Sequence, residues 1–360
     1  MTIPRDHIQS MAAYALADLS TSASGDIISL SQNESFRPPS PNVGEAVKSA
    51  LSQSMLYPDP DWRDLRNALA DVHAIQSVRI LCGNGSLDLI GAIARVYSGP
   101  KRSVLVSEHA YPFFRTAGAL SDARVDKAPE VDATVSVSAM IDAVRPDTGL
   151  VFIANPGNPT GTRLSKKDLV RLREGLRDDI LLVIDEAYGE FADHLGERCF
   201  DMVEGGNTIL LRTFSKAYGM AGYRVGWGLF PDLIQCEIRK VLNPNNVSSL
   251  SQVAALAALR DQRYMRETCD MTIEIRDRIA ADLKSAGFKV YPSFTNFLLI
   301  DCETEAKADD LDQRLRDEGI LLRKQVGAGL PGMVRMTVGT AEAVNIAVDW
   351  MIKWRAISCR

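Results

Sequence analysis

Residues 149–188, GLVFIANPGNPTGTRLSKKDLVRLREGLRDDILLVIDEAY, decide the fold. Two short apolar runs, at 149–154 and 180–184, flank an amphipathic stretch at 166–177. Runs this short predict buried strands, and the stretch between them predicts a helix that crosses from one strand to the next. A strand, a helix and a second strand in this order indicate a parallel sheet covered by helices.

The same alternation extends on both sides of this segment. Further strands are expected at 78–81, 103–106, 208–212 and 225–229, and further helices at 86–97 and 136–144. We therefore expect an α/β domain built on a mostly parallel sheet with helices on both faces.

The two ends of the chain have a different texture. The first 35 residues are expected to be helical in part, and the proline-rich stretch 37–41 is expected to be an extended linker. A long helix is expected over about 250–287, and then a small α+β domain with strands at 290–291, 297–301, 321–323 and 334–338 around a helix at 309–318. The predicted division is an N-terminal arm or lid that joins the small domain (1–43), a large cofactor-binding domain (44–250) and a small C-terminal domain (251–360).

Composition excludes several classes of protein. The 360 residues are 46% hydrophobic and 24% charged, as in an ordinary globular protein, and the net charge of -5 argues against nucleic-acid or anionic membrane partners. We expect no signal peptide, because the N-terminus lacks a basic stretch followed by an apolar core, and no membrane span. Six scattered cysteines without paired spacing favour reduced thiols in a cytoplasm and predict no metal site.

One lysine stands in an unusual setting. Lys216 lies in TFSKAYGMAGYR, residues 213–224, among small residues, aromatics and hydroxyls. An isolated lysine is usually a solvated surface cation, but this one is placed to lose water, and desolvation lowers the pKa of an amine. Such an amine can form a Schiff base with an aldehyde.

Three other polar segments each follow a predicted strand. They are CGNGS (82–86), NPGNPTG (155–161) and DEAY (185–188). Alone, the first two are explained as turns, and the carboxylates of the third as a helix cap, a metal ligand or a partner for a heterocyclic nitrogen. Because ligands bind at the carboxyl ends of parallel strands, three such segments and the Lys216 loop would meet at one edge of the sheet.

These motifs resemble those of the fold-type I pyridoxal-phosphate aminotransferases, and within them the histidinol-phosphate aminotransferase branch. The resemblance runs from LSQNE (30–34) to VRMTVGT (334–340). Asn158 precedes Asp185 by 27 residues, Asp185 precedes Lys216 by 31, and Lys216 precedes Arg224 by 8. It implies the aspartate aminotransferase-like fold, with a seven-stranded sheet in the large domain.

The resemblance also implies the cofactor, pyridoxal 5′-phosphate, and the residues that bind it. Lys216 would bind its aldehyde and Asp185 would pair with its ring nitrogen, so that the ring withdraws electrons. Asn158 and Tyr188 would bond the ring 3-oxygen, and Tyr111 would stack on the ring. The phosphate would be bound by Gly85, Ser86, Leu87, Thr213, Ser215 and Arg224.

The substrates and the assembly follow from the same resemblance. Arg335 matches an arginine that binds the α-carboxylate of an amino acid, and Arg323 matches one that binds the phosphate of histidinol phosphate. Tyr14 corresponds to an N-terminal tyrosine that closes over the substrate. Tyr57 matches a tyrosine donated to the phosphate site of a second subunit, which implies a homodimer with shared active sites; taken alone, it is equally well explained as a buried aromatic.

The expected activity is a ping-pong transfer from an amino donor to a 2-oxo acid such as 2-oxoglutarate. Histidinol phosphate is the leading donor, and aromatic amino acids are the alternative within the same branch. A threonine-phosphate decarboxylase-like lyase is the alternative from another class, because it needs only a different bond held perpendicular to the ring. The chain departs from the family pattern at QNESFR (32–37), at Leu87 and at Ala13-Tyr14. All of these departures are expected to bear on the N-terminal lid and therefore on substrate choice.

Overall fold

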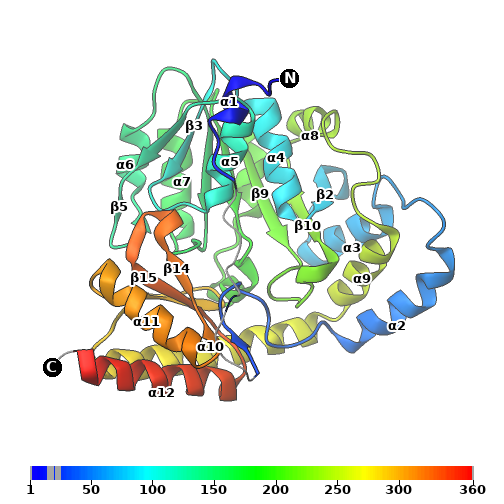
Figure 1. The fold of residues 1–360 in the computed structure, drawn as a ribbon. Helices are drawn as coiled ribbons and strands as arrows, with labels where there is room; N and C mark the ends of the chain where they lie inside the picture. The colour runs from blue at the N-terminus through cyan, green and yellow to red at the C-terminus, as the bar shows by residue number, and fades with distance from the viewer. Residues whose placement is uncertain (1, 14–19, 21–25, 359–360) are drawn as a thin grey trace.

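The computed structural model describes residues 2–13, 20 and 26–358, and its centre is a seven-stranded sheet (Figure 1). The strand order is β2-β10-β9-β8-β7-β3-β4. Neighbours are parallel except where β10 meets β2 and β9, so the expected mostly parallel sheet between helices is confirmed. The bounds are β2 (Ile80–Asn84), β3 (Ser103–Ser107), β4 (Val125–Ala128), β7 (Thr148–Ala154), β8 (Leu181–Asp185), β9 (Thr208–Thr213) and β10 (Val225–Leu229).

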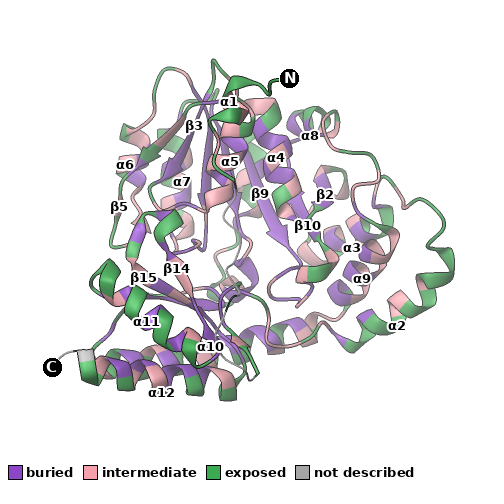
Figure 2. Cartoon of the chain, viewed as in Figure 1, coloured by how far each residue is buried: buried purple, intermediate pink, exposed green. Residues whose placement is uncertain are grey.

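Helices cover this sheet with their apolar faces. Strands β3, β8, β9 and β10 are buried at every position, which is the reason that their sequences are nearly continuous apolar runs (Figure 2). The helices of this part are α2 (Pro41–Ala50), α3 (Arg63–His73), α4 (Ser86–Tyr97), α5 (Pro112–Leu120), α6 (Val137–Asp142), α7 (Lys166–Gly175), α8 (Asp232–Arg239) and α9 (Ser249–Arg260).

The sequence missed one strand of this sheet, and one expectation was wrong in part. Strand β4 was not predicted, because an edge strand with the sequence VDKA carries no apolar run. The stretch 37–41 is not wholly an extended linker: Pro41 is the first residue of α2, and the Ser40 hydroxyl accepts a hydrogen bond from the Asn42 amide. Proline is well suited to a first helical position, since its missing N–H has no partner there.

A second, smaller sheet lies below the first in the view of Figure 1 and has the order β11-β12-β15-β14, with all neighbours antiparallel. Its bounds are β11 (Lys289–Val290), β12 (Phe297–Asp301), β14 (Arg323–Gln325) and β15 (Leu330–Thr337), and it packs with α10 (Gln262–Ser285), α11 (Glu305–Asp317) and α12 (Ala341–Ser358). The N-terminal strand β1 (Ile28–Ser29) pairs with β13 (Ile320–Leu321), and Leu30 belongs to the hydrophobic cluster of this smaller part.

The long helix expected over 250–287 is two helices. The helix is interrupted at Asp261, between α9 and α10. The Asp261 carboxylate accepts hydrogen bonds from the Tyr264 amide at 3.2 Å and from the Ser40 hydroxyl at 2.6 Å. A side-chain acceptor at a helix start replaces a missing backbone partner, which fixes the break. The larger hydrophobic cluster extends through α9 to Met265 and Cys269, and the division at residues 43 and 250 stays a prediction.

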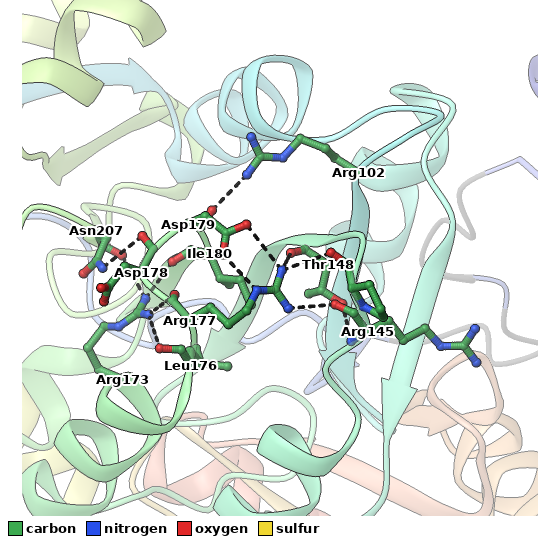
Figure 3. A network of polar contacts seen from close by, with 11 residues as sticks. Arg102, Arg145, Thr148, Arg173, Leu176, Arg177, Asp178, Asp179, Ile180 and Asn207 are labelled. Carbon is green, nitrogen blue, oxygen red and sulfur yellow. Dashed lines mark hydrogen bonds and ion pairs between the residues drawn. The ribbon is translucent and has the colours of Figure 1, made fainter.

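Arginine side chains form hydrogen bonds with backbone carbonyls at the amino ends of the central strands (Figure 3). Arg173 on α7 donates to the carbonyls of Ile180 at 2.7 Å and Asn207 at 3.3 Å, which precede β8 and β9. Arg177 donates to the carbonyls of Arg145 and Thr148 at the start of β7. At this edge of the sheet, Arg173 and Arg177 bind backbone carbonyl groups of the protein itself.

No helix in the described part of the chain is long and apolar enough to cross a membrane. The cytoplasmic location stays a prediction.

Candidate active site

A cavity of about 900 Å³ lies at the carboxyl ends of β7, β8 and β9. The smaller part of the molecule closes its other side with residues of β14 and β15, and the N-terminal segment contributes Ala12, Ala13 and residues 31–33. The lining includes most of the residues expected from the sequence: Ser86, Leu87, Tyr111, Asn158, Asp185, Tyr188, Thr213, Ser215, Lys216, Arg224, Arg323 and Arg335.

Lys216 lies in the loop that follows β9, and its amine is held inside the cavity. The Nζ atom donates to the backbone carbonyl of Asn33 at 2.9 Å. Burial lowers the pKa of Lys216 to about 8, and the nearby charges of Arg335 and Arg224 act in the same direction, while Glu34 and Asp185 oppose them. An amine with such a pKa is neutral in a usable fraction near pH 7, as a nucleophile or a general base requires.

Asp185 ends β8 with only 4% of its surface exposed. One carboxylate oxygen accepts from the Ala187 amide at 3.1 Å. Burial raises the pKa of Asp185 to about 7, and the Glu186 carboxylate adds to the rise while Lys216 opposes it. A buried carboxylate that faces a cavity without a full counter-charge fits a cationic heterocycle better than a helix cap.

The two residues expected at a ring 3-oxygen are both fixed by hydrogen bonds. The Asn158 side-chain oxygen accepts from Arg335 Nη1 at 2.8 Å, which joins the two parts of the molecule across the cavity. The Tyr188 hydroxyl accepts from the Asn33 side-chain amide at 2.8 Å. Tyr111 stands before α5 and rests edge-on against Phe114, with the ring centroids 5.6 Å apart.

An anion cradle lies where α4 begins. Gly85, at φ +75°, brings its backbone so close to Arg224 that an added Cβ would meet the guanidinium at 2.6 Å. Beside it lie the amino end of α4 and the Thr213 and Ser215 hydroxyls, whose oxygens are 3.0 Å apart. A helix amino end, two hydroxyls and a guanidinium are the donors that a phosphate prefers, so the residues present fit the phosphate that the resemblance implies.

The substrate-side arginines share one small sheet. Arg323 on β14 and Arg335 on β15 are direct cross-strand partners, and both line the cavity. Arg335 also donates to the Ser31 carbonyl at 2.9 Å.

Two tyrosines expected at the site are not among the described residues that line this cavity. Tyr14 lies outside the described residues. Tyr57 is not in the cavity of its own chain: it is 88% exposed, so the interpretation as a buried aromatic is wrong.

The sequence interpretation missed several cavity residues. Asn33 lies inside the segment LSQNE, which belongs to the resemblance, but nothing in its neighbours indicates that it contacts both Lys216 and Tyr188. Arg115 was missed too, although a lone arginine in the apolar helix PFFRTAGAL is a signal that could have found it. Across the described residues, no cluster of histidine, cysteine and carboxylate side chains could hold a metal ion.

Comparisons with known proteins show the family of this chain. A model of the family "Aminotransferase class I and II" matches residues 25–350. The histidinol-phosphate aminotransferase of Paramagnetospirillum magneticum is 38% identical over 352 residues, which are 96% of either chain. That of Granulibacter bethesdensis is 35% identical over 350 residues, 96% of this chain and 94% of the relative.

Solved structures show the same fold. Histidinol-phosphate aminotransferase from Sinorhizobium meliloti, in complex with pyridoxal-5′-phosphate, superposes with a TM-score of 0.92 at 29% identity and covers 99% of this chain and 98% of its own. A double mutant of Thermus thermophilus aspartate aminotransferase reaches a TM-score of 0.85 at 20% identity over 98% of this chain and all of its own, which supports the fold alone.

Proposed function

Since this chain belongs to the aminotransferase class I and II family, we propose that its amino donor is histidinol phosphate or a related aromatic amino acid and that its acceptor is 2-oxoglutarate. The chain is an aminotransferase that depends on pyridoxal 5′-phosphate. The single observation that carries the proposal is the meeting of Lys216, Asp185 and the phosphate cradle in one cavity with Arg323 and Arg335.

The cofactor, when bound, supplies an aldehyde that binds amines covalently and a cationic ring that withdraws electrons from the neighbouring carbon. Asp185 holds the proton on the ring nitrogen by its negative charge. Arg224, the amino end of α4 and the Thr213 and Ser215 hydroxyls bind the phosphate. Asn158 and Tyr188 would orient the ring at its 3-oxygen, and Tyr111 would cover one ring face.

Lys216 has two tasks in this proposal. Its amine would bind the aldehyde in the resting enzyme, and once released by a donor amine it is the base in the cavity that could remove a proton from the donor's Cα atom and return one. A pKa of about 8 keeps it able to do both near neutral pH.

Positive charge around the cavity favours a donor with a second anionic group. Beyond Arg335, the lining includes Arg115, Arg316, Arg323 and Lys324, while its only carboxylates in the described structure are Asp185 and Asp312. Arg316 pairs with Asp312 at 2.8 Å and Lys324 pairs with Asp309 at 2.7 Å. For Arg115, no ion pair forms with any described carboxylate, and it donates to the Gly327 carbonyl at 2.6 Å. A phosphate or a distal carboxylate would balance this excess.

A homodimer with shared active sites is the second part of the proposal. Tyr57 is exposed together with Leu51, Met55 and Leu56, so that a set of large apolar side chains faces solvent after α2. Apolar side chains gathered in this way mark a contact surface in many proteins. In the proposed dimer, the Tyr57 hydroxyl reaches the phosphate site of the partner.

A half-reaction experiment tests the donor. The loaded enzyme is mixed with one donor at a time, without a 2-oxo acid, and loss of the visible absorbance band is followed. Histidinol phosphate is expected to react with a larger kcat/KM than phenylalanine. Release of CO₂ from threonine phosphate without loss of the band would instead identify a lyase.

Arg323→Ala sharpens the same test. Removal of a charged hydrogen-bond donor should cost about 1.5–3 kcal/mol in kcat/KM for histidinol phosphate and much less for phenylalanine. Arg314→Ala is the matched control, because Arg314 pairs with Asp310 on an exposed face of α11. Equal losses with both donors in Arg323→Ala would contradict phosphate recognition by this residue.

A further inference from the structure

Asn33 is a buried polar residue to which the proposed mechanism gives no task. It is 1% exposed and lies in the segment between β1 and α2, with φ +55°. A left-handed backbone is uncommon outside glycine and is tolerated best by asparagine and aspartate. The side chain and the backbone of this one residue face the two groups nearest to the chemistry, Lys216 and Tyr188.

The orientation of the Asn33 side chain follows from its partners. The Asn33 backbone amide donates to Thr337 Oγ1 at 2.9 Å, and the Thr337 hydroxyl donates its own proton to Asn33 Oδ1, 3.2 Å away. Nδ2 is then left to donate to the Tyr188 hydroxyl at 2.8 Å. Each hydrogen-bond donor in this arrangement faces an acceptor, as a buried network requires.

This arrangement decides what Tyr188 can do. A phenol has one proton to donate, and because its oxygen accepts from Asn33, that proton points away from Asn33. A hydroxyl that accepts one hydrogen bond becomes a stronger donor in the next. The Asn33 carbonyl meanwhile accepts from Lys216 Nζ at 2.9 Å and from the Asn296 amide at 3.1 Å, so the same residue holds the amine beside the phenol.

We propose that Asn33 is a positioning residue that makes Tyr188 a hydrogen-bond donor toward the cofactor ring and keeps Lys216 next to it. This inference rests on the proposed role of Tyr188 at the ring 3-oxygen. A hydrogen-bond donor stabilises the ring 3-oxygen most when that oxygen is most negative. This would be the state in which the Lys216 nitrogen, bound to the aldehyde carbon, has lost its proton. Asn33 therefore favours loss of that proton and lowers the pH at which the absorbance of the bound cofactor changes.

The test is a spectral pH titration of the loaded enzyme and its variants. Asn33→Asp has nearly the same shape but accepts where asparagine donates, so it should draw the Tyr188 proton away from the ring. The midpoint of the absorbance change should rise by about one pH unit, on the scale of one lost hydrogen bond. The midpoint of Asn33→Ala should rise by a smaller amount. Asn33→Ala leaves the charged groups around Lys216 unchanged, and these are Arg335, Arg224, Asp185 and Glu34. Asn33→Asp adds a carboxylate beside them, whose charge also raises the midpoint, so the rise in Asn33→Ala is the measure of the lost hydrogen bond.

Asn296→Ala is the matched control. It removes hydrogen bonds to the Asn33 and Glu34 carbonyls but leaves the bond to Tyr188, so it should lower the melting temperature of the cofactor-free protein without moving the midpoint. An equal rise in Asn296→Ala would overturn the inference, because general loosening would then explain the effect. Where Asn33 variants do not fold, Thr337→Val removes the hydroxyl that orients the amide and should give a smaller rise.

The outcomes separate two failures. If the wild-type protein shows no pH-dependent band with pyridoxal phosphate, the proposed function fails. If the wild-type band titrates normally and the midpoints of Asn33→Asp, Asn33→Ala and Thr337→Val match it within about 0.2 pH unit, the inference about Asn33 is wrong and the proposed function stands.

Discussion

The two edges of the central sheet treat their polar side chains in opposite ways. At the amino edge, Arg173 and Arg177 donate to backbone carbonyls that precede the strands, and their hydrogen bonds lie within the protein (Figure 3). At the carboxyl edge, Asp185 is buried and Lys216 is half-buried beside a cavity, and the pKa values of both are shifted. One edge is built for stability, and the other keeps charged groups available for a ligand.

The difference has an energetic cause. Hydrogen bonds from a guanidinium to carbonyls satisfy groups that would otherwise be desolvated without partners. Burial of Asp185 and Lys216 instead disfavours the charged form of each, and their mutual attraction offsets this in part. Active sites often carry such destabilising groups, and replacing them raises stability at the expense of activity.

The largest effect is expected for Asp185→Asn. An amide keeps the shape but not the charge that holds a proton on the ring nitrogen, so turnover should fall by on the order of 10³-fold. Asp179→Asn at the amino edge is the control, because Asp179 pairs with Arg177 at 2.9 Å far from the cavity. Near-normal turnover in Asp185→Asn, measured with saturating cofactor, would contradict the role given to this carboxylate.

The same variant should gain stability without cofactor. Since the pKa of Asp185 is raised to about 7, against about 3.9 in the unfolded chain, ionisation destabilises the folded wild type as pH rises between these values. The advantage of Asp185→Asn should therefore be absent at pH 4, grow to a few kcal/mol by pH 7 and then stay level. Urea unfolding of the two cofactor-free proteins across this range measures it, and a constant difference would show that the carboxylate does not titrate as described.

At the amino edge, Arg173→Met should do the reverse. It removes hydrogen bonds to the carbonyls of Ile180, Asn207, Leu176 and Arg177 while keeping an apolar side chain, and should cost about 1–3 kcal/mol of unfolding free energy. Turnover of the folded enzyme at 25 °C should be unchanged. A large loss of turnover would mean that the two edges are coupled more tightly than their separation implies.

Tyr57→Phe should give the smallest effect. Loss of one neutral hydrogen bond to the phosphate of a partner subunit should weaken cofactor binding by about 0.5–1.5 kcal/mol. Sedimentation should show an unchanged dimer, because the ring and its apolar neighbours remain. A monomeric wild-type protein with full cofactor affinity would remove the basis for a shared site.

The contrast between the edges also explains what the sequence could predict. Asp185 ends an apolar strand, Asn158 lies in the turn after another, and Lys216 lies in an unusual loop, so pattern and position identified them. The arginines of the amino edge bond to carbonyls, which any residue carries, so no pattern points to them. Asn33 was missed for a related reason: its left-handed backbone and its bonds to two distant segments depend on how the small part of the molecule packs.

The central strands were predictable because burial on both faces makes them apolar. The edge strand β4 and the helix break at Asp261 were not predictable in this way.

The most direct test of the carboxyl edge is borohydride reduction of the loaded protein, followed by digestion and mass spectrometry. Reduction fixes the link between an amine and an aldehyde, so one modified peptide is expected, with pyridoxal phosphate on Lys216. Lys216→Ala, loaded and reduced in the same way, should carry no adduct. An adduct on another lysine of the wild type, or a fixed adduct in Lys216→Ala, would contradict the assignment.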